Sequence, residues 1–429
     1  MNGTTTHTNG SSHSDINSDS TPHPFKIIIA GAGIGGLFAS ICLATAGHSV
    51  TIYESSRFAL ETGAAIHLAP NVNGLLRKYG IFPEAFGAVT CEWLSQLKPD
   101  GSTVFLHDLR PLGKVYPYPW QLVHRIDLHN ALKEKARSLG VEIKLQSRVK
   151  GADCEKTSLV LESGEVVEGD LVIGADGVHS VLRNSVLGYD TLPKPSGTSA
   201  FRFLIPTSEI KSDPRTAHFV ERAGELAMVY GDERRLVMYP CRDNTELNFA
   251  AMIPDHESGA TEGDWNQAGS KETLLKLFDA FSDDTKALLE KAPPETVKLW
   301  KLLDHDALPN WTRGNVVLMG DAAHPFLPHQ GQGGAQALED GAALGALLPL
   351  GTLHSDILYR LELYTSSRCE RATVIQNYSR DSGLPIKGET HVKREIMNPM
   401  QFTEYNFRHD AFDHAASLLK TKSEDGVAQ

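Results

Sequence analysis

Three glycines and one acid near the start of the chain have the spacing of a nucleotide-binding loop. Gly31, Gly33 and Gly36 follow a short apolar run over residues 25–30, and Glu54 lies about 20 residues further on. Glycine at these positions permits a tight turn, close approach of the backbone to a pyrophosphate, and packing of a helix on a strand. The acid would hydrogen-bond ribose hydroxyls, and the start of the helix would face the phosphates. The motif predicts a dinucleotide site, and by itself it leaves NAD and FAD both open.

Two further motifs lie far downstream. The first reads GADGVHSVLR at residues 174–183, and the second begins with GDAAHP at residues 320–325 and ends with QGQGGAQALED at residues 330–340. With the first glycine motif, these segments resemble the paired signatures of the group A flavoprotein monooxygenases, which have the para-hydroxybenzoate hydroxylase fold. The resemblance covers nearly all of residues 25–380, and the sequence from Pro328 to Gly331 is most similar to the salicylate hydroxylase branch.

The resemblance implies FAD as the cofactor and suggests most of its contacts. Asp321 would accept hydrogen bonds from the ribityl hydroxyls, Arg125 would reach the cofactor from a neighbouring helix, and Asp176 would lie between the pyrophosphate and the nicotinamide entry. A small-residue loop at Gly63 and Ala64 is also expected to contact the cofactor. The remaining expected contacts are backbone amides at the start of a helix, at Gly331, Gly333 and Gly334, which suit the negative charge of a reduced flavin.

Each of these residues also has a purely structural interpretation. Asp321 would be a helix N-cap and Asp176 part of a turn. Arg125 would be an ordinary surface residue, and the glycines between 331 and 334 would form a flexible hinge. The sequence alone keeps these alternatives open.

Three residues are candidates for contact with a substrate. In this family a second sheet covers the flavin and the substrate lies between them, so Arg202 would pair with a carboxylate or phenolate and Tyr239 would hydrogen-bond a ring oxygen. Because side chains alternate across a strand, either residue could instead face away from the cavity. His329 is interpreted as a substrate ligand or as the base that deprotonates a phenol, with a structural role as the alternative. No metal site is expected, because neither His324 nor His329 has further ligands at a suitable spacing.

The implied reaction is aromatic hydroxylation. In this family NAD(P)H reduces FAD, dioxygen adds to give a flavin C4a-hydroperoxide, and its distal oxygen attacks an electron-rich ring. We therefore expect an FAD-dependent monooxygenase acting on a small phenolic or salicylate-type substrate, with loss of the carboxylate when attack occurs at the carbon that bears it. Two alternatives remain: epoxidation or dearomatising hydroxylation of a larger secondary metabolite, and a non-catalytic FAD-binding regulatory module. An NAD-dependent dehydrogenase would need only the first motif.

The predicted fold is α/β: a Rossmann-type FAD-binding domain interleaved with an antiparallel substrate sheet and followed by a C-terminal helical segment. Buried parallel strands are expected at residues 25–30, 49–53, 171–173 and 315–319, and short antiparallel strands between residues 198 and 253. The FAD-binding domain would comprise residues 25–195 and 301–350, with the substrate sheet at 196–300 and the helical region at 351–429. Residues 1–24 are polar and predicted to be disordered.

The overall composition is that of a globular protein without a nucleic-acid partner. The 429 residues carry a net charge of −12, and no run of about 18 apolar residues indicates a transmembrane segment. We expect a cytoplasmic monomer or homodimer. Residues 254–295 hold ten acids and four lysines, which is half of the excess of acidic over basic residues in the whole chain, and they lie outside every motif. The net charge therefore says little about the substrate, which can itself be an anion.

Overall fold

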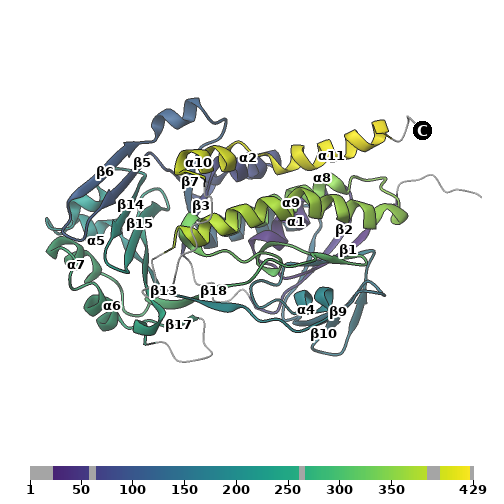
Figure 1. The fold of residues 1–429 in the computed structure, drawn as a ribbon, viewed down its shortest axis with the longest axis horizontal. Coiled ribbons are helices and arrows are strands. Elements are labelled where there is room, and N and C mark those ends of the chain that lie inside the picture. The colour runs from purple at the N-terminus through teal and green to yellow at the C-terminus, as the bar shows by residue number, and fades with distance from the viewer. Residues whose placement is uncertain (1–22, 58–63, 260–265, 384–396, 426–429) are drawn as a thin grey trace, which may run out of the picture.

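The computed structural model describes residues 23–57, 64–259, 266–383 and 397–425. The predicted disordered tail therefore falls outside the described residues, except for positions 23 and 24. Two large sheets, two three-stranded sheets and a layer of helices make up the fold (Figure 1). Over the described ranges, no helix combines the length and apolar character that a membrane crossing requires.

The first large sheet has six strands in the order β19-β20-β12-β1-β2-β8. All neighbours pair in parallel except β19 with β20. The strands, in chain order, are β1 (Lys26–Ala30), β2 (Ser49–Tyr53), β8 (Glu142–Lys144), β12 (Leu171–Gly174), β19 (Thr312–Arg313) and β20 (Val316–Leu318). The apolar residues of β1, β12 and β20 are fully buried, as expected for a sheet covered on both faces. Because parallel strands share one carboxyl edge, the loops that follow β1, β2, β12 and β20 meet there, and these loops carry the three motifs and Glu54.

Helices cover this sheet. Figure 1 shows α1, α8, α9 and α11 as a layer on the right of the molecule, with α4 and the β9–β10 hairpin below. The helices of the protein, in chain order, are α1 (Ile34–Thr45), α2 (Pro70–Lys78), α3 (Arg125–Ser138), α4 (Val181–Leu187), α5 (Thr207–Lys211), α6 (Lys271–Leu277), α7 (Asp283–Leu289), α8 (Gly333–Leu347), α9 (Ile357–Asp381), α10 (Pro399–Phe407) and α11 (Ala411–Asp425). The helical character predicted after residue 351 is thus present in the described part of that region.

The second large sheet has eight strands in the order β17-β18-β13-β16-β15-β14-β5-β6. They are β5 (Trp93–Leu97), β6 (Thr103–Asp108), β13 (Lys194–Pro206), β14 (Glu225–Tyr230), β15 (Arg235–Cys241), β16 (Glu246–Pro254), β17 (Asn266–Ala268) and β18 (Lys298–Asp304). Two features differ from the prediction. Strands β5 and β6 belong to this sheet although they precede residue 196, and β5 pairs with β14 in parallel, so the sheet is not purely antiparallel. The β5–β6 hairpin covers the edge of β14 that would otherwise be unpaired.

One face of the second sheet packs against α6 and α7. Phe201, Phe203 and Phe249 on the sheet form a core with Leu274 and Phe278 from the helical segment. Two helices form here because Ser270 and Ser282 each cap a separate helix start through their side chains. Since side chains alternate along a strand, residues between these phenylalanines face the opposite side of the sheet.

The two remaining sheets are small. One consists of β3 (Ala65–Leu68), β7 (Gln121–His124) and β4 (Val89–Thr90), in the order β3-β7-β4. The other consists of an antiparallel hairpin, β10 (Ser158–Leu161) and β11 (Val166–Glu168), extended by β9 (Val149–Asp153). Strand β3 continues from Ala64 and lies between the two large sheets, so its loop faces both.

Candidate active site

The first glycine motif forms a close-packed turn with free space beside Gly33. Gly31 has φ +101°, and a Cβ at this residue would lie 2.4 Å from the Ala175 carbonyl oxygen. A Cβ at Gly36 would lie 2.1 Å from the Gly31 carbonyl oxygen. A Cβ at Gly33 would meet no atom within 4 Å, and Gly33 borders a cavity at the start of α1. The three glycines therefore do what the motif predicts: two permit close packing, and one leaves room in front of a helix N-terminus.

Glu54 lies beside this turn at the end of β2. Its carboxylate accepts hydrogen bonds from the backbone N–H groups of Ala32 at 2.8 Å and Ser56 at 2.7 Å. These bonds hold the acid against the glycine loop, which is the place from which it would reach a ribose. Contact of Glu54 with the ribose itself stays a prediction.

Arg183 joins the second motif to the third. The side chain is fully buried and donates to three backbone carbonyl oxygens, those of Val178 at 2.9 Å, Asp321 at 2.7 Å and Ala322 at 2.8 Å. Its guanidinium therefore fixes the position of Asp321. The sequence placed Arg183 in the motif without a role, because two of its three partner carbonyls, those of Asp321 and Ala322, lie about 140 residues away in the chain.

The two motif aspartates behave differently. Both oxygens of Asp176 are engaged at the start of α4, where they accept from the Ser180 hydroxyl at 2.6 Å and from the N–H groups of Val181 and Leu182. This local bonding favours the structural interpretation of Asp176, and its predicted role beside the cofactor stays untested. Asp321 makes no side-chain cap and its side chain is open to the cavity, so the N-cap alternative is wrong. Enclosure by protein raises the pKa of Asp321, opposed by the positive charges of Arg183 and Arg125.

The third motif ends in a helix start without a side-chain cap. The N-cap of α8 is Gln332, which makes no capping hydrogen bond, and Gly333 and Gly334 form the first turn beside the cavity. Gly331 has φ +63°, and a Cβ there would lie 2.8 Å from Nδ1 of His67. Uncapped N–H groups at a helix start favour negative charge, and side chains here would fill the space in front of them.

Buried charges hold this helix in place. Arg368 on α9 donates to Asp340 at 2.8 Å and to Glu339 at 2.6 Å, and Arg371 donates to Glu339 at 2.7 Å. Asp340 also accepts from His324 at 2.7 Å and from the N–H of Gly320 at 2.8 Å. Both carboxylates are completely buried, so the acidic pair is a structural link between α8, α9 and the GD loop.

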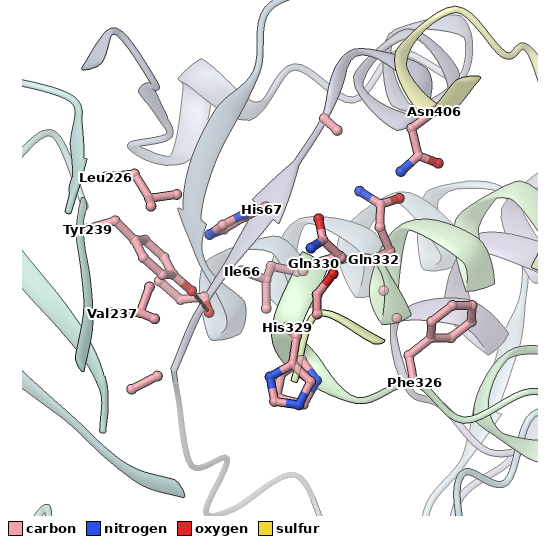
Figure 2. A pocket seen from close by; sticks show the side chains of 18 of the residues that line it. Ile66, His67, Leu226, Val237, Tyr239, Phe326, His329, Gln330, Gln332 and Asn406 are labelled. Atoms are coloured by element: carbon pink, nitrogen blue, oxygen red, sulfur yellow. Dashed lines mark hydrogen bonds between the residues drawn. The ribbon is translucent and has the colours of Figure 1, made fainter. Parts of the chain in front are cut away.

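These elements enclose one cavity of about 1290 Å³. Its floor is formed by the glycine turn, Arg125, Asp321 and the start of α8, and its roof by the face of the second sheet that looks away from α6 and α7. Figure 2 shows Leu226, Val237 and Tyr239 of the roof opposite His329, Gln330 and Gln332 of the loop before α8, with Ile66 and His67 between them. The described residues contain no group of three His, Cys, Asp or Glu side chains arranged to hold a metal ion.

Comparison with known proteins decides which nucleotide belongs here. Residues 25–377 match the family model described as an FAD binding domain. The chain belongs to this FAD-binding family. It is 33% identical to the hispidin-3-hydroxylase of Neonothopanus nambi over 82% of this chain and 86% of that protein. It is 34% identical to the 6-hydroxynicotinate 3-monooxygenase of Pseudomonas fluorescens over 83% and 91% of the two chains.

A solved structure confirms the architecture. The salicylate hydroxylase substrate complex superposes with a TM-score of 0.74 at 24% identity, covering 91% of this chain and 97% of that one. The predicted fold class and the resemblance to FAD-dependent monooxygenases are therefore confirmed, and the protein is a flavoprotein monooxygenase. The family match settles the choice that the first motif left open in favour of FAD.

The observed residues fit FAD. The space in front of Gly33 and the N-terminus of α1 suits a pyrophosphate, and the carboxylate of Asp321, open to the cavity, suits the ribityl hydroxyls. The uncapped start of α8 suits the flavin edge that becomes negative on reduction. Arg125 lines the cavity at the start of α3, and its backbone N–H donates to the carbonyl of Ala64. Ala64 also lines the cavity, whereas Gly63 lies outside the described residues.

Both roof candidates face the cavity. Arg202 on β13 and Tyr239 on β15 both line it, so each side chain lies on the face of its strand that points into the site. Arg202 has no hydrogen bond from its Nε and no carboxylate partner among the described residues; its guanidinium lies 5.7 Å from the Trp300 ring. Burial lowers the pKa of Arg202, which nevertheless stays a cation at neutral pH.

Tyr239 has a different partner from the one predicted. Its hydroxyl donates to the carbonyl oxygen of Ala65 at 2.6 Å, and Oδ1 of Asn248 accepts from the N–H of Ala65 at 2.9 Å. Two roof side chains thus hold both backbone polar groups of one residue, Ala65 at the start of β3. Tyr239 has no second proton to donate, so a bond from its hydroxyl to a substrate oxygen would cost the bond to Ala65. Sequence reasoning missed Asn248, which carries no motif.

Two histidines face the cavity as neutral rings. Burial lowers the pKa of His329 to about 4, helped by the nearby charge of Arg235, and burial alone lowers that of His67 to about 4. A phenol has a pKa of about 10, so complete proton transfer to His329 would cost about 8 kcal/mol at 1.36 kcal/mol per pKa unit. Nδ1 of His329 has no hydrogen-bond partner among the described residues. The lowered pKa therefore favours His329 as a neutral hydrogen-bonding ring over His329 as a base.

Proposed function

We propose that this monooxygenase hydroxylates a phenolic or salicylate-type aromatic substrate with NAD(P)H and O2, and that Arg202 binds the negative charge of the substrate. The observation that carries the proposal is a half-buried arginine that lines the cavity, with a buried Nε that makes no hydrogen bond and no carboxylate partner among the described residues. A buried cation without a counterion is costly unless a ligand supplies one. The relatives that act on hispidin and on 6-hydroxynicotinate support an aromatic substrate.

The residues of the chain have separate tasks in this reaction. Bound FAD would supply the redox chemistry that activates dioxygen, and the protein supplies binding, orientation and electrostatics. Arg202 lowers the pKa of a bound phenol or neutralises a ring carboxylate, which keeps the ring electron-rich and correctly placed. Tyr239 and Asn248 fix the peptide of Ala65, and the apolar roof keeps water away from the reacting ring.

Carbon dioxide release is part of the proposal for salicylate-type substrates only. When the attacked ring carbon carries a carboxylate, the new C–O bond replaces the C–C bond and the electron pair of that bond returns to the ring. Arg202 would hold the carboxylate before it leaves. A neutral phenol with a free ortho position would be hydroxylated without this loss.

The test uses holoenzyme and two matched ligands, salicylate and its neutral amide. We expect NAD(P)H consumption to be accompanied by an equal amount of hydroxylated product for the anion, and the Arg202→Lys variant to retain part of this activity. Rapid NAD(P)H oxidation that yields only hydrogen peroxide with every phenol would refute the proposed function. Equal kinetics for the anion and the amide would refute the role of Arg202.

A further inference from the structure

The cavity roof is much wider than one aromatic ring. The side chains that line it come from six consecutive strands, from β13 through β16, β15, β14 and β5 to β6. With neighbouring strands about 4.8 Å apart, five spacings give a roof about 24 Å across. A single substituted ring needs about two spacings.

The two ends of the roof differ in chemistry. Arg202 lies at the β13 end, and Phe105 lies on β6 at the other end. Between them the lining is mixed: Val237 on β15 and Met228 on β14 are apolar, whereas Arg235 on β15 and Gln96 on β5 are polar. The β13 end therefore suits a charged ring, and the apolar side chains toward the β6 end suit an apolar extension of that ring.

The far end is closed by a helix that lies beyond the segment defining the family. The family model ends at residue 377, whereas α10 spans Pro399–Phe407 and presents Thr403 and Phe407 to the cavity. The Phe407 ring packs on the Trp120 ring at 5.4 Å. Nε1 of Trp120 is buried without a hydrogen-bond partner among the described residues.

We infer that the natural substrate is an elongated molecule: an anionic phenolic ring held at Arg202 that carries a mainly apolar extension reaching under β14, β5 and β6 to α10. This inference rests on the proposed function and refines its substrate class. It favours a larger substrate than salicylate itself. Burial of the extension against the apolar roof would add affinity at about 25 cal/mol per Å² of apolar surface.

The test compares ligands that share one reacting ring. Salicylate is compared with its 4-styryl and 5-styryl derivatives, and the dissociation constant of each is measured on holoenzyme from the perturbed flavin spectrum, together with kcat/KM. We expect at least one styryl derivative to bind tenfold or more tightly than salicylate. Phe105→Ala removes a side chain at the far end of the roof, and Thr403→Trp narrows the same end of the cavity. Each variant should reduce the affinity advantage of the styryl ligand at least fivefold and leave the dissociation constant of salicylate unchanged.

Each variant has a matched control. Leu106→Ala changes the next residue of β6, which points to the other face and is exposed, and Thr403→Ser keeps the hydroxyl and the open space. Both controls should preserve the advantage of the styryl ligand. Salicylate binding as tightly as both derivatives, or an advantage that neither Phe105→Ala nor Thr403→Trp reduces, would overturn the inference. If the styryl ligands bind with the expected advantage but no ligand is hydroxylated, the proposed function fails and the elongated site stands.

Discussion

Replacement of Arg202 by methionine should change stability and substrate affinity in opposite directions. The substitution keeps an unbranched side chain of similar length and removes a buried cation that has no carboxylate partner among the described residues. Replacing buried charges with apolar groups is neutral or stabilising by about 1–4 kcal/mol. Loss of the contact with the Trp300 ring opposes this by about 0.5–1 kcal/mol. We therefore expect the free energy of unfolding to rise by about 0–3 kcal/mol.

The affinity for an anionic ligand should fall in the same variant. A hydrogen bond to a charged group contributes about 1.5–3 kcal/mol, which corresponds to a loss of about 10- to 150-fold in the dissociation constant. The assays are urea denaturation of the ligand-free protein and titration with salicylate and salicylamide, and only the anion should lose affinity. A destabilised variant that binds both ligands with equally reduced affinity would show that Arg202 is a structural residue and that the reasoning about its unpaired charge is wrong.

Three further predictions concern the supports of the site. Tyr239→Phe leaves the Ala65 carbonyl without its donor and should reduce the free energy of unfolding by about 1–3 kcal/mol and lower the yield of product per NAD(P)H; an unchanged yield would contradict its positioning role. Arg368→Met leaves two buried carboxylates short of a partner and should lower the free energy of unfolding, measured by urea denaturation, by about 3–5 kcal/mol. A decrease of less than about 1 kcal/mol would contradict a stabilising role for this charge network. The free energy of unfolding should fall between pH 7 and pH 5, because His67 and His329 stay neutral in the fold with pKa values near 4, while the same residues in the unfolded chain protonate near 6.5. Each histidine lowers the free energy of unfolding by about 2 kcal/mol at pH 5. Glutamine at both positions should make the pH profile shallower, and a profile of unchanged slope would contradict the assignment.

The parts of the site that depend on local backbone geometry were predictable from the sequence. Gly31 and Gly36 stand where any Cβ would collide with a neighbouring carbonyl, so their spacing alone specifies the turn. The strand order then brings the motif loops to one edge, which explains why Asp321 was found although it lies far from Gly33 in the chain. Contacts of this kind are encoded in short segments and recur with the motif.

Other features depend on distant partners and left weaker signals. The hairpin of β5 and β6 could have been found, because residues 93–97 are followed by a turn at Asp100 and Gly101 and a second β-prone run. That it joins β14 in parallel could not, since pairing between distant strands is set by tertiary packing. The same holds for Arg368, whose partners lie 28 and 29 residues away on another helix, and for the bond from Tyr239 to Ala65.

The central claim is that one oxygen atom of dioxygen is transferred to an aromatic ring bound between the second sheet and the start of α8. The most direct measurement is product analysis by mass spectrometry after turnover of holoenzyme with NAD(P)H, 18O2 and salicylate or its styryl derivatives. The account predicts one 18O atom in the aromatic product for each NAD(P)H oxidised in the coupled reaction. Product whose new oxygen comes from water, or oxidation of NAD(P)H that gives 18O-labelled hydrogen peroxide and no labelled aromatic product, would contradict it.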